Sequence, residues 1–199
     1  MFLLAGLGNP GAKYASNRHN VGFMAIDAIA EKNKFPLFRQ RFGGLMCRGR
    51  IEPEDVILFK PSGYMNNSGQ PLATVVQFFK LSLSNIWVIH DDLDIELGRV
   101  KVKRGGGAGG HNGLKSIDSH IGSDYSRLRI GIGRPPRDTD VSNYVLSDFK
   151  SNDLLWLDNL IPEIGGTMPF LLNADPQAFC NNIVSSCLLY TSPSPRDRG

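Results

Sequence analysis

The sequence predicts a single-domain α/β layered fold, with helices on both faces of a central, twisted, mixed and largely parallel sheet. Three observations predict it. Apolar runs of strand length alternate with segments whose apolar residues recur at helical spacing. Glycine-rich turns separate several of these segments. The length of 199 residues suits one domain with its own buried core.

The first half of the chain contains five predicted elements. Residues 2–7 form an uninterrupted apolar run, which is typical of a strand buried on both faces. Residues 19–33 carry apolar side chains at the spacing of one helix face. Two further strands are predicted over 45–51 and 56–60, joined by a turn around Pro53. The fifth element is a helix over 71–80 with an apolar inner face.

The second half continues the alternation. An apolar strand over 86–89 ends at His90-Asp91-Asp92. Three further elements follow. Residues 99–103 form a strand in which polar and apolar residues alternate, 110–121 form a short helix after a glycine loop, and 128–132 form another strand. A helical pattern from residue 152 leads to Pro162, and a second helical segment begins near Pro176.

Two segments of different character divide the chain. Residues 1–186 form the predicted α/β domain. Residues 187–199 are rich in Pro, Ser and Arg and have no periodicity, so we expect an atypical tail that is disordered or non-native.

Composition narrows the class of protein. Residues 1–150 hold 20 Lys and Arg against 14 Asp and Glu, so the domain has a modest basic excess that suits a polyanionic partner. The three cysteines have no C-x-x-C spacing, which argues against a disulfide framework or a zinc ribbon. Because the sequence has neither a secretory signal nor an apolar run of membrane-spanning length, we expect a cytoplasmic protein without membrane contact.

The turn after the first strand, Gly6-Leu-Gly-Asn-Pro-Gly11, matches the dinucleotide fingerprint G-x-G-x-x-G. However, Pro10 and a polar loop replace the helix that would bind a pyrophosphate, and Glu31 falls within the first helix instead of at a strand end. We therefore exclude dinucleotide binding. The turn and the loop after it present the amide of Asn9 and the imidazole of His19, two groups that can catalyse hydrolysis.

His19 is the candidate general base, because an imidazole that titrates near pH 6.5 can accept a proton from water. Asp91 or Asp92, at a strand end, can accept the other ring N–H and fix the tautomer. Side-chain amides at predicted strand-to-helix junctions can hold a carbonyl and a water: Asn9, Asn66 and Asn112. Structural alternatives remain for each type, since His can cap a helix, Asp can cap a turn and Asn tolerates a left-handed backbone. The role of His111 stays open.

A basic surface is predicted around the glycine loop. Arg99, Lys101 and Lys103 alternate with valines, so one strand face carries three cations. Arg104 leads into Gly105–Gly110, a loop opening a helix whose free N–H groups suit an anion, and Arg134 extends this surface. The alternative is an edge strand protected by cations.

A metal centre is a weaker hypothesis. Two histidines besides His19, together with Asp91, could supply ligands, namely His90 and His111, but none of the spacings is typical of a strong metal site. We expect hydrolysis without a metal or cofactor.

The chain resembles bacterial-type peptidyl-tRNA hydrolases from residue 2 to about residue 183. The resemblance rests on motifs that occur together in order: Gly6–Gly11, Tyr14, Arg18–Gly22, Lys60-Pro61, Tyr64–Gly69, His90–Asp94, Gly105–Leu114, Arg129–Pro135 and Tyr144–Phe149. It implies a monomeric enzyme that cleaves the ester between a peptide and the terminal ribose of tRNA, with no metal. Non-catalytic RNA binding and metal-dependent phosphoester hydrolysis are the alternative functions.

The resemblance also implies roles for individual residues. His19 matches the base and Asp91 the residue that orients it. The positions that match substrate-binding residues or lie in the matching motifs are Asn9, Tyr14, Tyr64, Met65, Asn66 and Asn112. Lys103 and Arg134 match tRNA-facing cations, with Lys101 and Arg104 beside them. The expected partner is peptidyl-tRNA, contacted at its acceptor stem and terminal adenosine.

Overall fold

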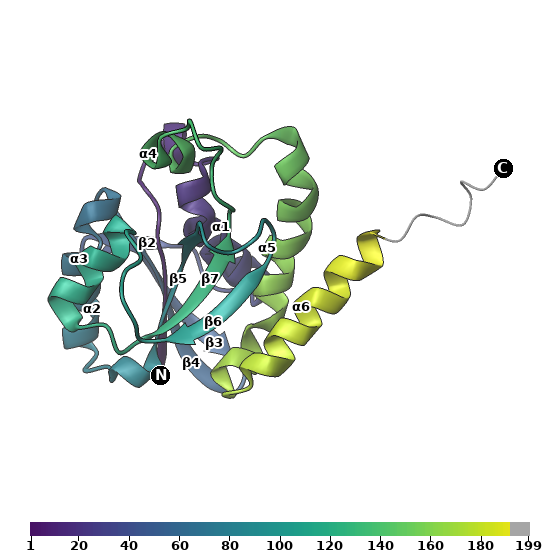
Figure 1. Cartoon of the computed structure of the whole chain (residues 1–199). Helices are drawn as coiled ribbons and strands as arrows, with labels where there is room; N and C mark the ends of the chain where they lie inside the picture. Colours follow the sequence, from purple (N-terminus) through teal and green to yellow (C-terminus); the bar gives the residue numbers. More distant parts are fainter. Residues whose placement is uncertain (192–199) are drawn as a thin grey trace.

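A seven-stranded mixed sheet forms the centre of the molecule, with the strand order β2-β3-β4-β1-β5-β7-β6 (Figure 1). The structure is a computed structural model that describes the backbone of residues 1–191 and the side chains of residues 1–183. The four central strands are mutually parallel: β4 (Glu54–Pro61), β1 (Phe2–Gly6), β5 (Ile86–Asp92) and β7 (Ser126–Gly131). Antiparallel strands complete both edges: β2 (Arg39–Arg41), β3 (Gly44–Ile51) and β6 (Val100–Arg104). The predicted mixed, largely parallel sheet is confirmed.

Helices cover both faces of this sheet (Figure 1). One face carries α1 (Val21–Lys32), α5 (Ser151–Leu172) and α6 (Pro176–Thr191). The other carries α2 (Gly69–Phe78) and α3 (Asn112–Ile121). A separate cluster of buried apolar side chains lies under each layer. The short helix α4 (Val141–Val145) contacts the turn that precedes α1.

Two glycines allow α1 to approach the sheet closely. A Cβ atom on Gly6 would lie 2.3 Å from the backbone oxygen of Gly22, and one on Gly22 would lie 2.3 Å from the oxygen of Ile89. No side chain fits at either distance. The first glycine of the G-x-G-x-x-G pattern therefore serves helix–strand packing, which sets the position of the residues just before α1.

Two elements run past the residues at which their predicted pattern stops, β5 and α5. β5 continues beyond Ile89 to Asp92, because His90 and Asp91 pair with Arg129 and Ile130 of β7. The helical pattern that leads to Pro162 continues beyond it, since α5 runs through Pro162 and Pro169. Its buried apolar face continues past the first proline and packs against α1, which offsets the lost backbone hydrogen bond.

The predicted tail of residues 187–199 falls only in part on the described structure. Helix α6 includes residues 187–191, and residues 192–199 lie outside the described residues. Among the described helices, none combines the length and the apolar character that crossing a membrane requires.

Candidate active site

A cleft of about 870 Å³ opens at the carboxyl ends of the central parallel strands. This edge is where ligands bind in open α/β sheets, and the volume is typical of a ligand site. Ten of the predicted site residues line it: Asn9, Tyr14, His19, Tyr64, Met65, Asn66, Asp91, Lys103, Asn112 and Arg134. Lys101 and Arg104 are not among the lining residues.

His19 and Asp91 form a buried pair in this cleft. His19 lies on a 3-10 turn, Arg18–Asn20, directly before α1, and Asp91 lies near the end of β5. The Nδ1 atom of His19 is 2.8 Å from Oδ1 of Asp91. An ionised carboxylate only accepts hydrogen bonds, so Nδ1 carries the proton. Nε2 of His19 therefore keeps its lone pair, and it has no hydrogen bond to any described residue.

His111 is a second imidazole on the same carboxylate oxygen, and the sequence analysis left its role open. Its Nε2 atom is 3.0 Å from Oδ1 of Asp91. Its Nδ1 atom caps α3 by accepting from the backbone N–H groups of Gly113 and Leu114, at 3.1 and 3.4 Å. Because Nδ1 is an acceptor, the proton of neutral His111 is on Nε2 and points at Asp91. Its place at the start of the helix predicted over 110–121 was the one sequence signal for this capping role.

The cluster keeps Asp91 ionised. Burial acts to raise the pKa of Asp91, but His111 and His19 outweigh it and hold the pKa of the carboxyl well below its usual range. A proton taken up from water therefore goes to an imidazole rather than to Asp91.

His90 stays neutral beside this cluster. Its Nδ1–H donates to the backbone oxygen of Asp91 at 2.7 Å, and its buried Nε2 has no partner among the described residues. Burial, reinforced by nearby His111, lowers the pKa of His90 to about 3.

The same residues form a possible ligand set for a metal ion. One ligand atom each from His19, Asp91 and His111 lies within 4.8 Å of the others. However, His111 could bind an ion only through Nε2, which would move its proton to Nδ1 and direct it at two backbone N–H groups. The donor set therefore fits a hydrogen-bonded acid–base cluster better than a metal centre.

The amide of Asn9 is held in a fixed orientation. Its Oδ1 atom accepts from the backbone N–H of Met65 at 2.8 Å, which leaves Nδ2 as the available donor. The side chain of Asn20 bonds both the N–H and the C=O of Asn9, at 2.9 Å each. The sequence analysis placed Asn20 only within the motif Arg18–Gly22 and missed this supporting role. Asn66 and Asn112 are exposed in the cleft.

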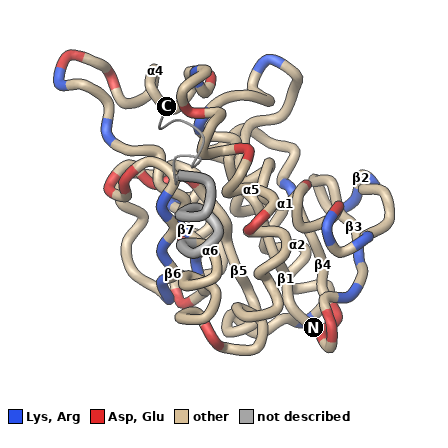
Figure 2. The backbone as a smooth tube through the Cα atoms, turned by 90° about the vertical axis from the view of Figure 1, so that its right-hand side faces the viewer, with Lys and Arg blue, Asp and Glu red and all other residues tan. Residues whose placement is uncertain are grey.

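Cations gather along β6 and β7, at one edge of the sheet (Figure 2). Two arginines that line the cleft are paired with carboxylates: Arg129 Nε lies 2.8 Å from Asp92, and Arg134 Nε lies 2.8 Å from Asp94. Lys103 lines the cleft without an ion pair to a described residue. The sequence analysis did not assign Arg129 to the site, because its position in a predicted buried strand does not indicate that its side chain faces the cleft.

Side chains of β6 and β7 hold the glycine loop, Gly105–Gly110, in place. Buried Arg127 donates to the backbone oxygens of Gly107 and Gly106, at 2.8 and 2.5 Å. Lys103 packs so closely on Gly106 that a Cβ atom there would lie 2.7 Å from Nζ. Arg104, in contrast, is held outside the cleft by Asp124 at 3.0 Å.

A family model described as peptidyl-tRNA hydrolase matches residues 3–187. The chain belongs to the peptidyl-tRNA hydrolase family. A peptidyl-tRNA hydrolase of Mesorhizobium japonicum is 48% identical over 181 residues, which cover 91% of this chain and 75% of the relative. That of Ruegeria pomeroyi is 49% identical over 183 residues, covering 92% and 77%. The crystal structure of peptidyl-tRNA hydrolase from Acinetobacter baumannii superposes with a TM-score of 0.85 at 40% identity, covering 92% of this chain and 94% of that one. The resemblance inferred from the motifs is confirmed for the family and for the fold.

Proposed function

We propose that this member of the peptidyl-tRNA hydrolase family hydrolyses the ester between a peptide, or an N-blocked amino acid, and the 3′-terminal ribose of tRNA, and so recycles the tRNA. The observation that carries the mechanism is the shared carboxylate of Asp91. It fixes the tautomers of His19 and His111 and leaves Nε2 of His19 free at the cleft.

The base acts on water. Nε2 of His19 takes a proton from a water molecule as its oxygen attacks the acyl carbon. The negative charge of Asp91, 2.8 Å from Nδ1, stabilises the imidazolium that forms. The imidazolium then returns the proton to the ribose oxygen as the ester bond breaks. The water oxygen ends in the carboxylate of the released peptide.

Amide groups supply the second part of the chemistry. The available Nδ2 of Asn9 is a donor for the ester carbonyl as its oxygen gains negative charge. We assign Asn66 and Asn112 to the peptide backbone and the attacking water. Met65, Tyr14 and Tyr64 complete the wall of the substrate site.

Lys103 and Arg134 are the candidates for phosphate contacts with the acceptor stem. Such contacts position the tRNA without reading its bases. Lys101 and Arg104 are exposed beside the cleft, so we assign them at most to an outer part of the phosphate surface.

The proposed acid–base pair, His19 and Asp91, is complete within one cleft, so we propose a monomer. We further propose that it acts in the cytoplasm, because its proposed substrate is a product of translation. Sedimentation of the purified protein checks the first point. A dimer whose dissociation abolishes turnover would contradict it.

The decisive experiment is turnover of N-acetyl-aminoacyl-tRNA in ¹⁸O-labelled water with a chelator present. We expect free tRNA and one labelled oxygen in the released carboxylate. Label in a phosphate group, or activity that the chelator abolishes, would favour the metal-dependent phosphoesterase. Absence of turnover would favour a non-catalytic RNA-binding module.

A further inference from the structure

A second, smaller hollow adjoins the active-site cleft. Its volume is about 260 Å³, and Asn9 lines both spaces. We call it the Phe23 hollow. Residues of four segments form its apolar wall: Pro10 and Ala15 after β1, Phe23 and Met24 on α1, Leu45 on β3 and Pro61 on β4. A space of this size lies below the range typical of whole ligands and suits one or two side chains.

Apart from Asn9, which the hollow shares with the cleft, the polar side chains of the hollow already have partners. Lys60 is paired with Asp27, and its Nζ atom lies 4.6 Å from the centre of the Phe38 ring. Asn20 bonds the backbone of Asn9. The hollow therefore offers no uncompensated charge, and a charged side chain entering it would lose hydration without gaining a partner. An apolar side chain would gain from burial there.

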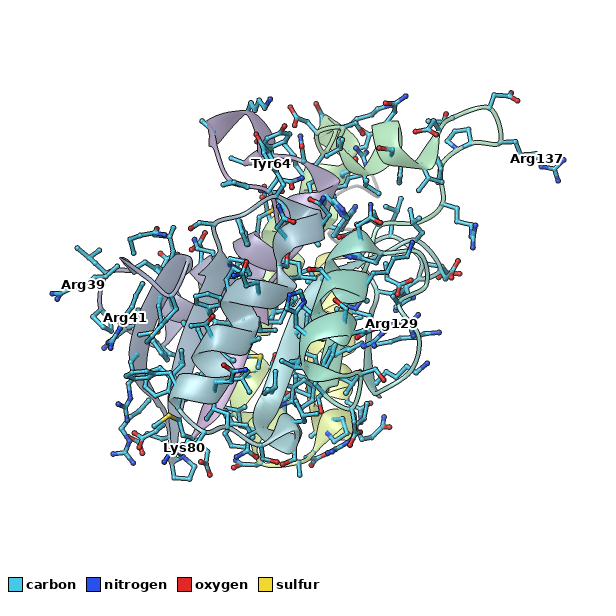
Figure 3. All side chains as sticks on the ribbon, turned by 90° about the vertical axis from the view of Figure 1, so that its left-hand side faces the viewer. Arg39, Arg41, Tyr64, Lys80, Arg129 and Arg137 are labelled. Carbon is cyan, nitrogen blue, oxygen red and sulfur yellow. The ribbon has the colours of Figure 1, made fainter. Side chains whose placement is uncertain are left out.

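The position of the hollow relative to the cations indicates what enters it. The cations assigned to phosphate lie by β7 and β6, at one edge of the sheet, whereas the hollow lies by β4 and β3, beyond β1. In Figure 3, Arg129 and Arg137 lie on one side of the molecule, Arg39 and Arg41 on the other, and Tyr64 stands between them. Neither Arg39 nor Arg41 lines the cleft or the hollow.

The two parts of a peptidyl-tRNA extend in opposite directions from the ester. With the ester at His19 and Asn9 and the tRNA over β7 and β6, the peptide leaves toward β4 and β3. We propose that the Phe23 hollow is a peptide subsite, which receives an uncharged, apolar side chain upstream of the residue esterified to tRNA. This inference rests on the proposed function and adds a preference for peptide sequence to it.

Two variants test the subsite without touching the proposed catalytic residues. Ala15 is exposed, so Ala15→Trp fills the hollow from its rim. Leu45 is 37% exposed, so Leu45→Ala removes part of the wall with little effect on the core. Leu37→Ala is the matched control, because Leu37 is 90% exposed and lies outside both spaces.

Three substrates are compared by kcat/KM: N-acetyl-leucyl-tRNA and two N-acetyl-tripeptidyl-tRNAs that end in the same leucine. The tripeptides carry either leucine or glutamate at both upstream positions. We expect the native chain and Leu37→Ala to prefer the leucine tripeptide by about 10-fold, the low end of what one methylene contributes in a hydrophobic pocket, because the hollow is open. Ala15→Trp should abolish this preference, and Leu45→Ala should reduce it.

The one-residue substrate separates the two proposals. All four proteins should hydrolyse N-acetyl-leucyl-tRNA equally. A native chain without preference between the tripeptides, or variants that keep the native preference, would overturn the subsite while leaving the esterase intact. Variants that slow all three substrates equally would also overturn it. Failure of the native chain on N-acetyl-leucyl-tRNA would overturn the proposed function itself.

Discussion

Replacing Asp91 with asparagine removes the negative charge of the acid–base cluster but keeps an oxygen that accepts hydrogen bonds. The imidazolium formed during catalysis then loses its nearest counter-charge. With about 4 Å between the charge centres and an effective dielectric constant of about 20, the lost attraction is about 4 kcal/mol. This corresponds to about a 10³-fold decrease in kcat. Because His111 donates to the same oxygen and shares its charge, we expect a decrease of about 10²- to 10³-fold.

The assay is release of tRNA from saturating N-acetyl-aminoacyl-tRNA at neutral pH. Asp55→Asn is the matched control, since Asp55 is an exposed carboxylate far along the chain from the cluster, and it should keep native turnover. Denaturant unfolding of both variants checks that each is folded. Native kcat in folded Asp91→Asn would refute the role of the carboxylate charge.

Three other perturbations have defined outcomes. The free energy of unfolding should fall by up to about 1.4 kcal/mol per pH unit as the pH drops from about 6.5 toward 3. In this range His90 binds a proton in the unfolded chain but stays unprotonated in the folded one, where burial lowers its pKa to about 3. His90→Gln should show a shallower slope by denaturant titration, and an unchanged slope would contradict the assignment. Lys103→Ala should raise KM for the tRNA substrate. It should also reduce the slope of log KM against log salt concentration by about one, the value expected for the loss of one phosphate contact. An unchanged slope would show that Lys103 is not part of the phosphate-binding surface. Gly22→Ala should destabilise the fold by about 1–3 kcal/mol, since its Cβ would lie 2.3 Å from the oxygen of Ile89, whereas Gly166→Ala meets only the end of a lysine side chain and should be tolerated. Equal thermal stabilities of the two glycine variants would refute the close-packing argument.

Sequence pattern predicted the sheet because its central strands are continuous apolar runs, and the long helices because their apolar residues recur at helical spacing. It failed for β2 and α4, which are too short for any period to emerge. It also failed where tertiary packing outweighs local preference. Proline normally ends or kinks a helix, but α5 contains Pro162 and Pro169 because its packing on α1 stabilises the helix.

The candidate site was predicted to the extent that it depends on strand ends. His19 comes after β1, and Asp91 lies near the carboxyl end of β5, the neighbouring parallel strand, so the fold class alone brings them to one edge. The role of His111 depends on which ring nitrogen faces the α3 backbone, and no sequence pattern encodes that orientation. Asn20 was missed for the same reason, since its bonds to Asn9 span a turn whose path becomes visible only in the structure.

Chemical rescue of His19→Ala tests whether Nε2 of His19 removes the proton from the attacking water. The variant should lose turnover of N-acetyl-aminoacyl-tRNA by about 10²- to 10⁴-fold while it stays folded. Added imidazole should then restore part of the rate with saturation, because the vacated space beside Asp91 can hold a free ring whose second nitrogen accepts the proton of water. Native turnover in His19→Ala, with no response to imidazole, would contradict the account.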